Sequence, residues 1–111
     1  MSEYFVYMLT NRWKNVLYTG MTDSLEGRLS DHKHRRFEGF TKKYNCDRLV
    51  YFERHDNGDS ATAREHRIKG WTRAKKNALI ATINPEWSDL SPVWHTLKGG
   101  DPSASLRSAS G

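Results

Sequence analysis

Three short stretches of the chain are apolar, aromatic or β-branched at most positions. Residues 4–9 (Tyr-Phe-Val-Tyr-Met-Leu) are apolar or aromatic throughout, which is typical of a strand covered on both faces. Residues 16–19 and 48–54 form two further runs of this kind. Because turn-forming residues separate these runs, the pattern predicts three antiparallel strands in one small sheet.

The first two strands are expected to form a hairpin. If its loop is Asn11–Lys14, Tyr7 lies opposite Tyr18. Directly opposed residues share a face of the sheet, so two phenol hydroxyls would project side by side. Gly20 would end the second strand, where its missing side chain lets backbone or ligand come close.

A helix is expected directly after the hairpin. Residues 25–36 contain no proline, and Thr, Asp and Ser at 22–24 are all good N-cap residues. Arg28 and His32 are one turn apart on this helix, so both can point at one site. A lone arginine and histidine on a helix are more often solvated or partnered, so the spacing alone assigns them no chemistry.

Two more helices are expected after the third strand. Asp59 or Ser60 can cap a helix over residues 61–70, and another helix begins at Thr72 and is stopped by Pro85. The predicted class is therefore α+β, a small three-stranded antiparallel sheet flanked by helices.

Two polar residues of these helices are candidates for function. Glu65 borders the apolar side of its helix, from which a carboxylate can reach the sheet. A surface ion pair with Arg64 or Lys69 is the alternative, and such pairs are common and weak. Asn77 lies in mid-helix, where an asparagine without a hydrogen-bonding task is mildly unfavourable.

The charge of the chain points to an anionic partner. Its 111 residues include 18 Lys and Arg against 13 Asp and Glu, a formal net charge of +5 with a pI near 9.5. The excess is concentrated in residues 32–36, in Lys42 and Lys43, and in residues 64–76. Basic clusters beside aromatic residues are typical of proteins that bind phosphodiesters, although solvated helix faces with rings packed beneath them have the same composition.

The cysteine count and the hydropathy of the chain argue against several other classes of protein. The single cysteine, Cys46, cannot form an internal disulfide, and the histidine spacings match no common zinc motif. No run approaches the length of a membrane span and no export signal is present, so we expect a cytoplasmic protein. The length fits one domain over residues 1–97, followed by a flexible tail over 98–111. We expect a monomer rather than an oligomer.

Several polar positions recur in an order that is specific to one family. In chain order they are Tyr7, Tyr18, Arg28, His32, Glu65 and Asn77. With the triplets Phe5-Val6-Tyr7 and Tyr18-Thr19-Gly20, this order resembles the GIY-YIG nuclease domain, and the resemblance covers residues 4 to 90. Two positions depart from the family pattern: Phe5 replaces the glycine of the first triplet, and Met21 stands where some members have a lysine that aids deprotonation.

The resemblance implies a role for each of these residues. Tyr7 or Tyr18 is the general base or positions the attacking water, and Glu65 binds one divalent cation, Mg²⁺ or Mn²⁺. Arg28 clamps the phosphate, while His32 assists proton transfer and takes the place of the missing lysine. The residues expected to hold the substrate are Asn77, Lys33, Arg36, Lys42, Lys43 and Lys69.

The chemistry of these side chains fits phosphodiester hydrolysis. A single carboxylate with waters and a substrate phosphate is a normal magnesium site, and arginine donates two hydrogen bonds to phosphate in a geometry that lysine cannot copy. A free phenol has a pKa near 10, so a tyrosine base needs positive charge nearby.

The leading hypothesis is a divalent-metal-dependent endonuclease acting on structured or single-stranded DNA in repair or recombination. The alternative is a nucleic-acid-binding module that has little activity alone and relies on a protein partner. A structural or protein-interaction domain is the third class, and it predicts no salt-dependent binding of nucleic acid.

Overall fold

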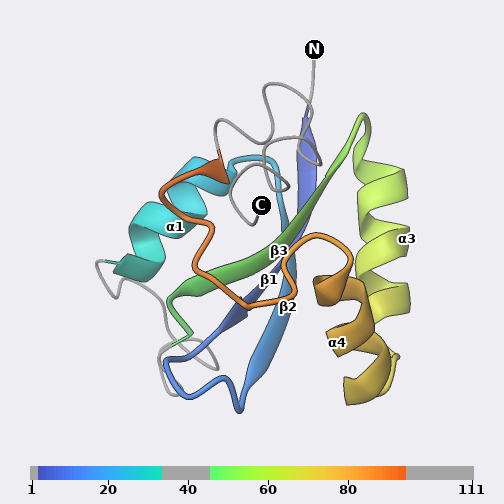
Figure 1. Cartoon of the computed structure of the whole chain (residues 1–111). Helices are drawn as coiled ribbons and strands as arrows, with labels where there is room; N and C mark the ends of the chain where they lie inside the picture. The colour runs from blue at the N-terminus through green and yellow to red at the C-terminus, as the bar shows by residue number, and fades with distance from the viewer. Residues whose placement is uncertain (1–2, 34–45, 95–111) are drawn as a thin grey trace.

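A computed structural model describes residues 3–33 and 46–94 of the chain, with the backbone alone for residues 31–33. Its elements are β1 (Tyr4–Thr10), β2 (Leu17–Thr22), α1 (Leu25–Lys33), β3 (Arg48–His55), α3 (Gly58–Lys69) and α4 (Arg73–Ala81). The strands form one antiparallel sheet in the order β2-β1-β3. Helix α1 covers one face of the sheet, and α3 and α4 lie on the other (Figure 1). The predicted α+β class is confirmed.

Two buried clusters lie on opposite faces of the sheet because side chains of the central strand alternate between them. Phe5, Tyr7 and Leu9 of β1 pack on the face of α1. Val6 and Met8 pack on the face of α3 and α4. All five are at most 2% exposed, which explains why residues 4–9 carry no polar position.

The chain after α4 folds back over the sheet. Leu90 donates its backbone N–H to Leu49 of β3 at 2.7 Å. Trp94 packs its ring edge-on against Phe5, with ring centres 5.8 Å apart. Leu90 and Trp94 therefore complete the cluster on the α1 face, and Trp87 packs against the cluster on the other face.

The register of the hairpin differs from the prediction. Tyr7 pairs with Gly20, and Tyr18 pairs with Leu9, so the expectation that the two tyrosines lie directly opposite each other was wrong by two residues. A shift of two residues keeps every side chain on its face, whereas a shift of one would have reversed it. Tyr7 and Tyr18 therefore still share a face, as diagonal neighbours.

The longer loop has a local cause. It spans residues 11–16, and Asn11 and Asn15 exchange two hydrogen bonds across it, at 2.6 and 3.2 Å. Lys14 adopts a positive φ of 59° at the turn, a conformation that lysine rarely takes. The side-chain bonds of the two asparagines outweigh this cost and move the turn beyond the four residues predicted.

The helix boundaries agree only in part with the prediction. α3 begins at Gly58, because Asn57 is its N-cap and accepts a hydrogen bond from the Ser60 backbone at 2.8 Å; the expectation that Asp59 or Ser60 caps it was wrong. Thr72 caps α4 as predicted. Within residues 3–33 and 46–94, no helix has the length and apolar composition of a membrane-spanning segment.

Candidate active site

Tyr7 and Tyr18 form the centre of the candidate site. Their ring centres lie 6.2 Å apart at an interplanar angle of 48°, and a hydrogen bond joins their side chains. Tyr7 is 2% exposed, while Tyr18 is half-buried. Of the two phenols, Tyr18 is therefore the one that a solvent-borne substrate can approach.

Because Gly20 has no side chain, the Tyr7 ring can lie directly beside it. A Cβ atom at position 20 would lie 2.7 Å from the Tyr7 hydroxyl and 2.9 Å from Cε2 of Tyr18, closer than side-chain carbons approach other atoms. The hydroxyl thus lies over the edge strand β2. The expectation that Gly20 ends the strand was wrong, since β2 continues to Thr22, but the missing side chain does permit a close approach.

Arg28 enters the site from α1. The start of this helix is fixed at Ser24, whose side chain accepts from the Gly27 backbone at 3.3 Å and whose carbonyl accepts from the Arg28 backbone at 3.0 Å. Arg28 follows in the first turn of the helix and is exposed. Its cation lowers the pKa of Tyr7 and is therefore within electrostatic reach of that hydroxyl.

Glu65 approaches from α3, on the other face of the sheet. Its side chain is 15% exposed, forms an ion pair with Lys69 at 3.4 Å and lies 3.7 Å from Nε2 of His66. The pair with Lys69 is the alternative considered for Glu65, and it uses a residue that was predicted to hold substrate. The other partner considered, Arg64, bonds elsewhere.

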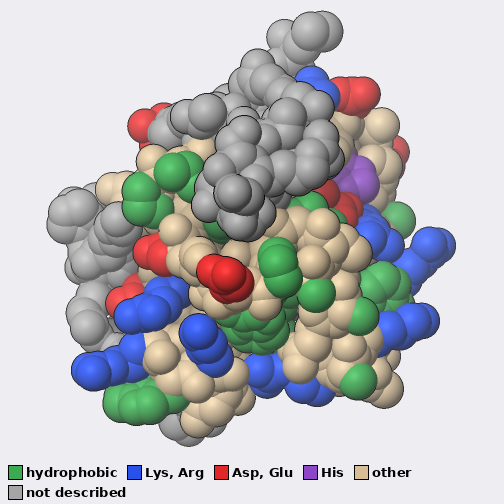
Figure 2. All heavy atoms as spheres, viewed as in Figure 1, with side chains coloured by type: hydrophobic (Ala, Val, Ile, Leu, Met, Phe, Trp, Pro, Cys, Tyr) green, Lys and Arg blue, Asp and Glu red, His purple; other side chains and the backbone are tan. Residues whose placement is uncertain are grey.

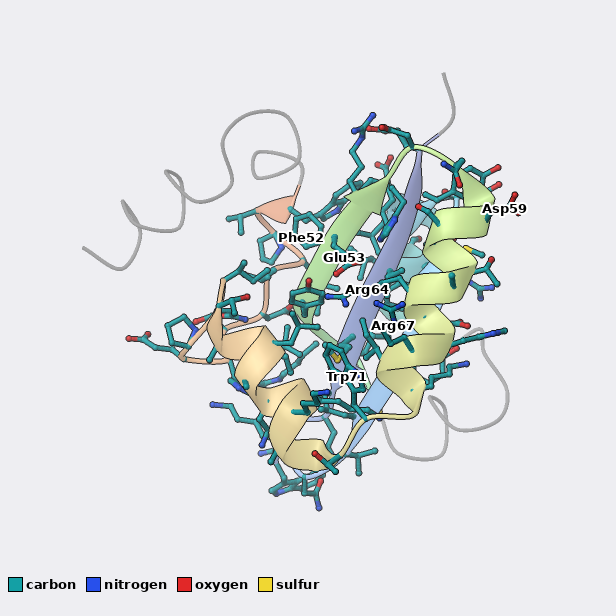
Figure 3. The ribbon with its side chains drawn as sticks, turned by 90° about the vertical axis from the view of Figure 1, so that its right-hand side faces the viewer. Phe52, Glu53, Asp59, Arg64, Arg67 and Trp71 are labelled. Atoms are coloured by element: carbon teal, nitrogen blue, oxygen red, sulfur yellow. The ribbon has the colours of Figure 1, made fainter. Side chains whose placement is uncertain are left out.

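A network that the sequence did not reveal joins α3 to β3. Arg64 donates to both carboxylate oxygens of Glu53, at 3.1 and 3.2 Å, and points toward it across the two elements (Figure 3). Tyr51 donates to the same carboxylate at 2.5 Å, and His55 bonds to it at 2.6 Å. Although burial opposes the charge, these bonds and the Arg64 cation lower the pKa of Glu53. The network fixes the helix that carries Glu65.

The pKa of Tyr7 shows which groups surround its hydroxyl. Burial raises this pKa most, and the adjacent Tyr18 raises it further. The Arg28 cation acts in the opposite direction, and the Glu65 carboxylate adds a smaller increase. Arg28 and Glu65 are therefore both within electrostatic reach of one hydroxyl, although they lie on helices that cover opposite faces of the sheet.

Alkaline titration should distinguish the tyrosines by the pH at which each phenol ionises. Burial also raises the pKa of Tyr51, helped by its hydrogen bond to Glu53. Because the folded chain binds these two protons more tightly than the unfolded chain does, their contribution to stability is complete below pH about 10 and declines above it. We expect at least two of the five tyrosines to ionise only as the protein unfolds. Phenolate absorbance measures the ionisation, and circular dichroism on the same samples measures the unfolding. Titration of all five near pH 10 in a folded protein would contradict this, and Tyr7→Phe should remove one of the late tyrosines.

The other predicted site residues are distributed as follows. His32 and Lys33 belong to α1, one turn and five residues after Arg28, and only their backbone is described. Asn77 lies on α4 and accepts from Arg73 at 2.9 Å. Asn77 and Arg73 both line a pocket of about 300 Å³, and no tyrosine among residues 3–33 and 46–94 lines it. The positions and segments outside the described residues are Arg36, Lys42, Lys43, the loop at 40–44 and the tail at 98–111.

The donor set allows one kind of metal site. Within residues 3–33 and 46–94, no three His, Cys, Asp or Glu side chains gather into a site made of protein ligands alone. Glu65 contributes one carboxylate near the tyrosine pair. A single hard oxygen ligand suits Mg²⁺ or Mn²⁺, which keep several waters and take further ligands from substrate phosphate.

Known proteins resemble this chain in sequence and in fold. The sequence matches the GIY-YIG catalytic domain over residues 3–78. It is 36% identical over 80 residues to a UPF0213 protein of Natronomonas pharaonis, covering 72% of this chain and 93% of the relative. It is 38% identical over 87 residues to a UPF0213 protein of Syntrophus aciditrophicus, covering 78% and 98%. The fold is similar to the solution NMR structure of a UPF0213 protein from Bacillus halodurans, with a TM-score of 0.52 and 22% identity, covering 82% of this chain and 96% of that one.

Proposed function

The chain belongs to the GIY-YIG catalytic domain family, which places it in a nuclease superfamily, and from this premise we propose that it is a divalent-metal-dependent endonuclease that hydrolyses phosphodiester bonds in DNA. The proposed substrates are structured or single-stranded DNA in repair or recombination. One observation carries the proposal: Tyr18, Arg28 and Glu65, from three separate elements, all act on the Tyr7 hydroxyl.

We assign different tasks to the two tyrosines. Because its pKa is raised, Tyr7 keeps its proton near neutral pH and serves as a hydrogen-bond donor. The bond between the two tyrosines contributes to that increase, and we propose that in it Tyr7 donates and the Tyr18 oxygen accepts. A donor aimed at Tyr18 stabilises negative charge on its oxygen. Tyr18 is therefore the group proposed to orient the attacking water and take its proton.

Arg28 is proposed to hold the scissile phosphate. It is exposed on the first turn of α1, where a planar guanidinium can donate two hydrogen bonds to phosphate oxygens and stabilise the charge that develops in the transition state. His32 lies one turn later on the same helix, and we propose that it assists proton transfer in the absence of a lysine at Met21.

Glu65 is the residue that would hold the divalent cation. The cation, when bound, neutralises charge on the phosphate and favours ionisation of water. Lys69 contacts the same carboxylate at 3.4 Å, which keeps the side chain extended along α3 and adds positive charge beside the site. No further carboxylate from the protein would be required, since waters and the substrate phosphate would supply the remaining ligands.

A second function is favoured by two of the same observations. A buried Tyr7 with a raised pKa and a Glu65 carboxylate paired with Lys69 are also compatible with a nucleic-acid-binding module that turns over slowly without a protein partner. This alternative predicts salt-dependent binding with little cleavage.

The experiment that tests the proposal compares substrates and metals. The purified protein is incubated with labelled single-stranded, duplex, flap and junction DNA and with RNA, in Mg²⁺, Mn²⁺ or chelator. We expect cleavage that requires the cation and that Tyr18→Phe lowers about a hundredfold or more. Tyr4→Phe, which removes a phenol hydroxyl from the opposite cluster, is the matched control and should cleave normally. Salt-dependent binding without cleavage of any substrate would favour the binding module.

A further inference from the structure

The pocket of about 300 Å³ that contains Asn77 is a second candidate binding site. It lies between the β1–β2 loop and α4, and the residues that line it are Lys14, Arg73, Asn77, Pro85, Glu86 and Trp87. The candidate catalytic residues Tyr7, Tyr18, Arg28 and Glu65 do not line it. Lys and Arg side chains gather over the same loop and helix along the lower side of the molecule (Figure 2), so the surroundings of the pocket suit an anion.

Arg73 builds one wall of the pocket. Its guanidinium donates to the carbonyls of Lys14 at 2.9 Å and Asn15 at 3.3 Å, and to the side-chain oxygen of Asn77 at 2.9 Å. It also lies 5.6 Å from the ring centre of Trp87. Because one side chain joins the loop, α4 and the indole, the walls are in place before any ligand arrives.

Trp87 also lines the pocket, and its backbone adopts an unusual conformation. Its φ is +57°, which costs a bulky residue on the order of 1 kcal/mol or more and persists only where the surroundings enforce it. The enforcing residue is the buried Asn84, whose carbonyl accepts from the Trp87 backbone at 3.1 Å and whose amide donates to Val50 and Ser88 at 3.0 and 2.9 Å. The turn thus fixes the indole at the pocket.

The polar groups of the pocket complement the edge of a nucleobase. The Asn77 oxygen is taken by Arg73, which leaves its amide N–H groups as donors, and among the described residues they have no partner. The Glu86 carboxylate is an acceptor for an exocyclic amino group. Pro85 and Trp87 supply apolar surface for the base. Such a donor–acceptor pair favours bases with an exocyclic amino group over thymine.

Basic and aromatic groups near the opening of the pocket can bind the phosphate of a nucleotide and a neighbouring base. The ammonium of Lys14 forms no ion pair with any described residue and is available to a phosphate. Since Glu86 repels phosphate, the base must enter toward Glu86 and the phosphate must remain near Lys14. Trp13 is 65% exposed beside it, with the Arg12 guanidinium 5.1 Å from its ring centre, which is a surface on which a neighbouring base can stack.

We propose that this pocket binds one unstacked nucleotide of the nucleic acid that is cleaved beside Tyr18. This inference rests on the proposed function, because the nucleotide belongs to the nucleic acid that the proposed endonuclease cleaves. Lys14 precedes Tyr18 by four residues, so at most about 14 Å of chain separates them, and one strand of substrate can occupy both sites. The pocket would then select substrates in which a base near the scissile bond is free to leave the stack.

The direct test is a titration of ¹⁵N-labelled full-length protein, in chelator, with each of the four deoxynucleoside 5′-monophosphates. Inorganic phosphate and 2-deoxyribose 5-phosphate are the base-free probes. We expect saturable shifts of the Trp87 indole and Asn77 amide signals with the nucleotides, weakest with dTMP, and not with the base-free probes. Equal shifts with the base-free probes would reduce the pocket to an anion site and overturn the proposal, as would no shift at these two signals.

Three variants test which side chains bind. Lys14→Gln and Glu86→Gln should each weaken nucleotide affinity about tenfold, and the spectra themselves report whether the fold is intact. Arg67→Gln removes an exposed cation of α3 that does not line the pocket and should change nothing. Unchanged affinity in both pocket variants would contradict the proposal.

Cleavage kinetics separate this inference from the function on which it rests. On a cleaved substrate, Lys14→Gln and Glu86→Gln should raise KM about tenfold with kcat nearly unchanged, because the pocket binds ground state and transition state alike. If the wild-type protein cleaves a substrate but the titrations show no nucleotide binding at the pocket, only the inference is overturned. Nucleotide binding at the pocket without cleavage of any substrate overturns only the endonuclease proposal.

Discussion

Replacing Glu65 by glutamine should abolish metal-dependent cleavage while nucleic-acid binding and the fold are retained. The substitution keeps the size of the side chain and removes the charge that a hard divalent cation requires. We expect the cleavage rate to fall about a hundredfold or more, as when a main electrostatic contact to the transition state is lost. The free energy of unfolding should change little, because the pair that is lost joins Glu65 to Lys69, which is half-exposed.

The control for this variant is Glu3→Gln, which removes a carboxylate paired with Arg54 at 2.8 Å. It should cleave at the wild-type rate. Binding of labelled DNA is measured in chelator, where no cleavage occurs, and should agree within about twofold among the three proteins. Metal-dependent cleavage by Glu65→Gln at the normal rate would exclude Glu65 as the ligand of the cation.

Alanine at Gly20 should damage the site and the fold together. Its Cβ atom would lie 2.7 Å from the Tyr7 hydroxyl, 2.8 Å from Cζ of the same ring and 2.9 Å from Cε2 of Tyr18. Tyr7 is buried at the centre of the sheet, so its ring cannot swing aside without disturbing the cluster around it. We expect a loss of about 1–3 kcal/mol of stability from overpacking and a cleavage rate reduced about a hundredfold, because small displacements of catalytic groups are costly.

The matched control is Gly58→Ala at the start of α3. There a Cβ atom would lie 3.5 Å from the nearest atoms of Tyr4, an ordinary contact, so stability and cleavage should stay near the wild-type values. Both variants are compared by thermal melting and by cleavage of one substrate. Wild-type activity and stability in Gly20→Ala would mean that the two rings are not fixed over β2 as described.

The hairpin shows how far a sequence pattern can lead. The side-chain alternation of the strands correctly predicted that Tyr7 and Tyr18 share a face, because this depends only on a period of two. The register was missed because it depends on the turn, and the turn is set by hydrogen bonds between Asn11 and Asn15. Two asparagines four residues apart were a visible signal, but their pairing competes with several shorter turns.

Helix α3 gives a second example. A helix was predicted there, but Asn57 begins it earlier than the cap residues that were considered. The helix is fixed to the sheet by Arg64 and Glu53, which are eleven residues apart on different elements. Many charged residues of the chain are equally plausible partners for either one, so only the packing of α3 on β3 selects this pair.

The order of motifs and the strand and helix periodicities by themselves determined the family resemblance, the α+β class and the set of candidate catalytic residues. They did so because these properties depend on local spacing. The tertiary structure alone decided that Arg28 and Glu65 reach one hydroxyl from opposite faces of the sheet, that Gly20 makes room for that hydroxyl, and that Asn77 lines a separate pocket. These relations join residues far apart in the chain, and their distances follow from how the helices pack on the sheet rather than from the identity of any one residue.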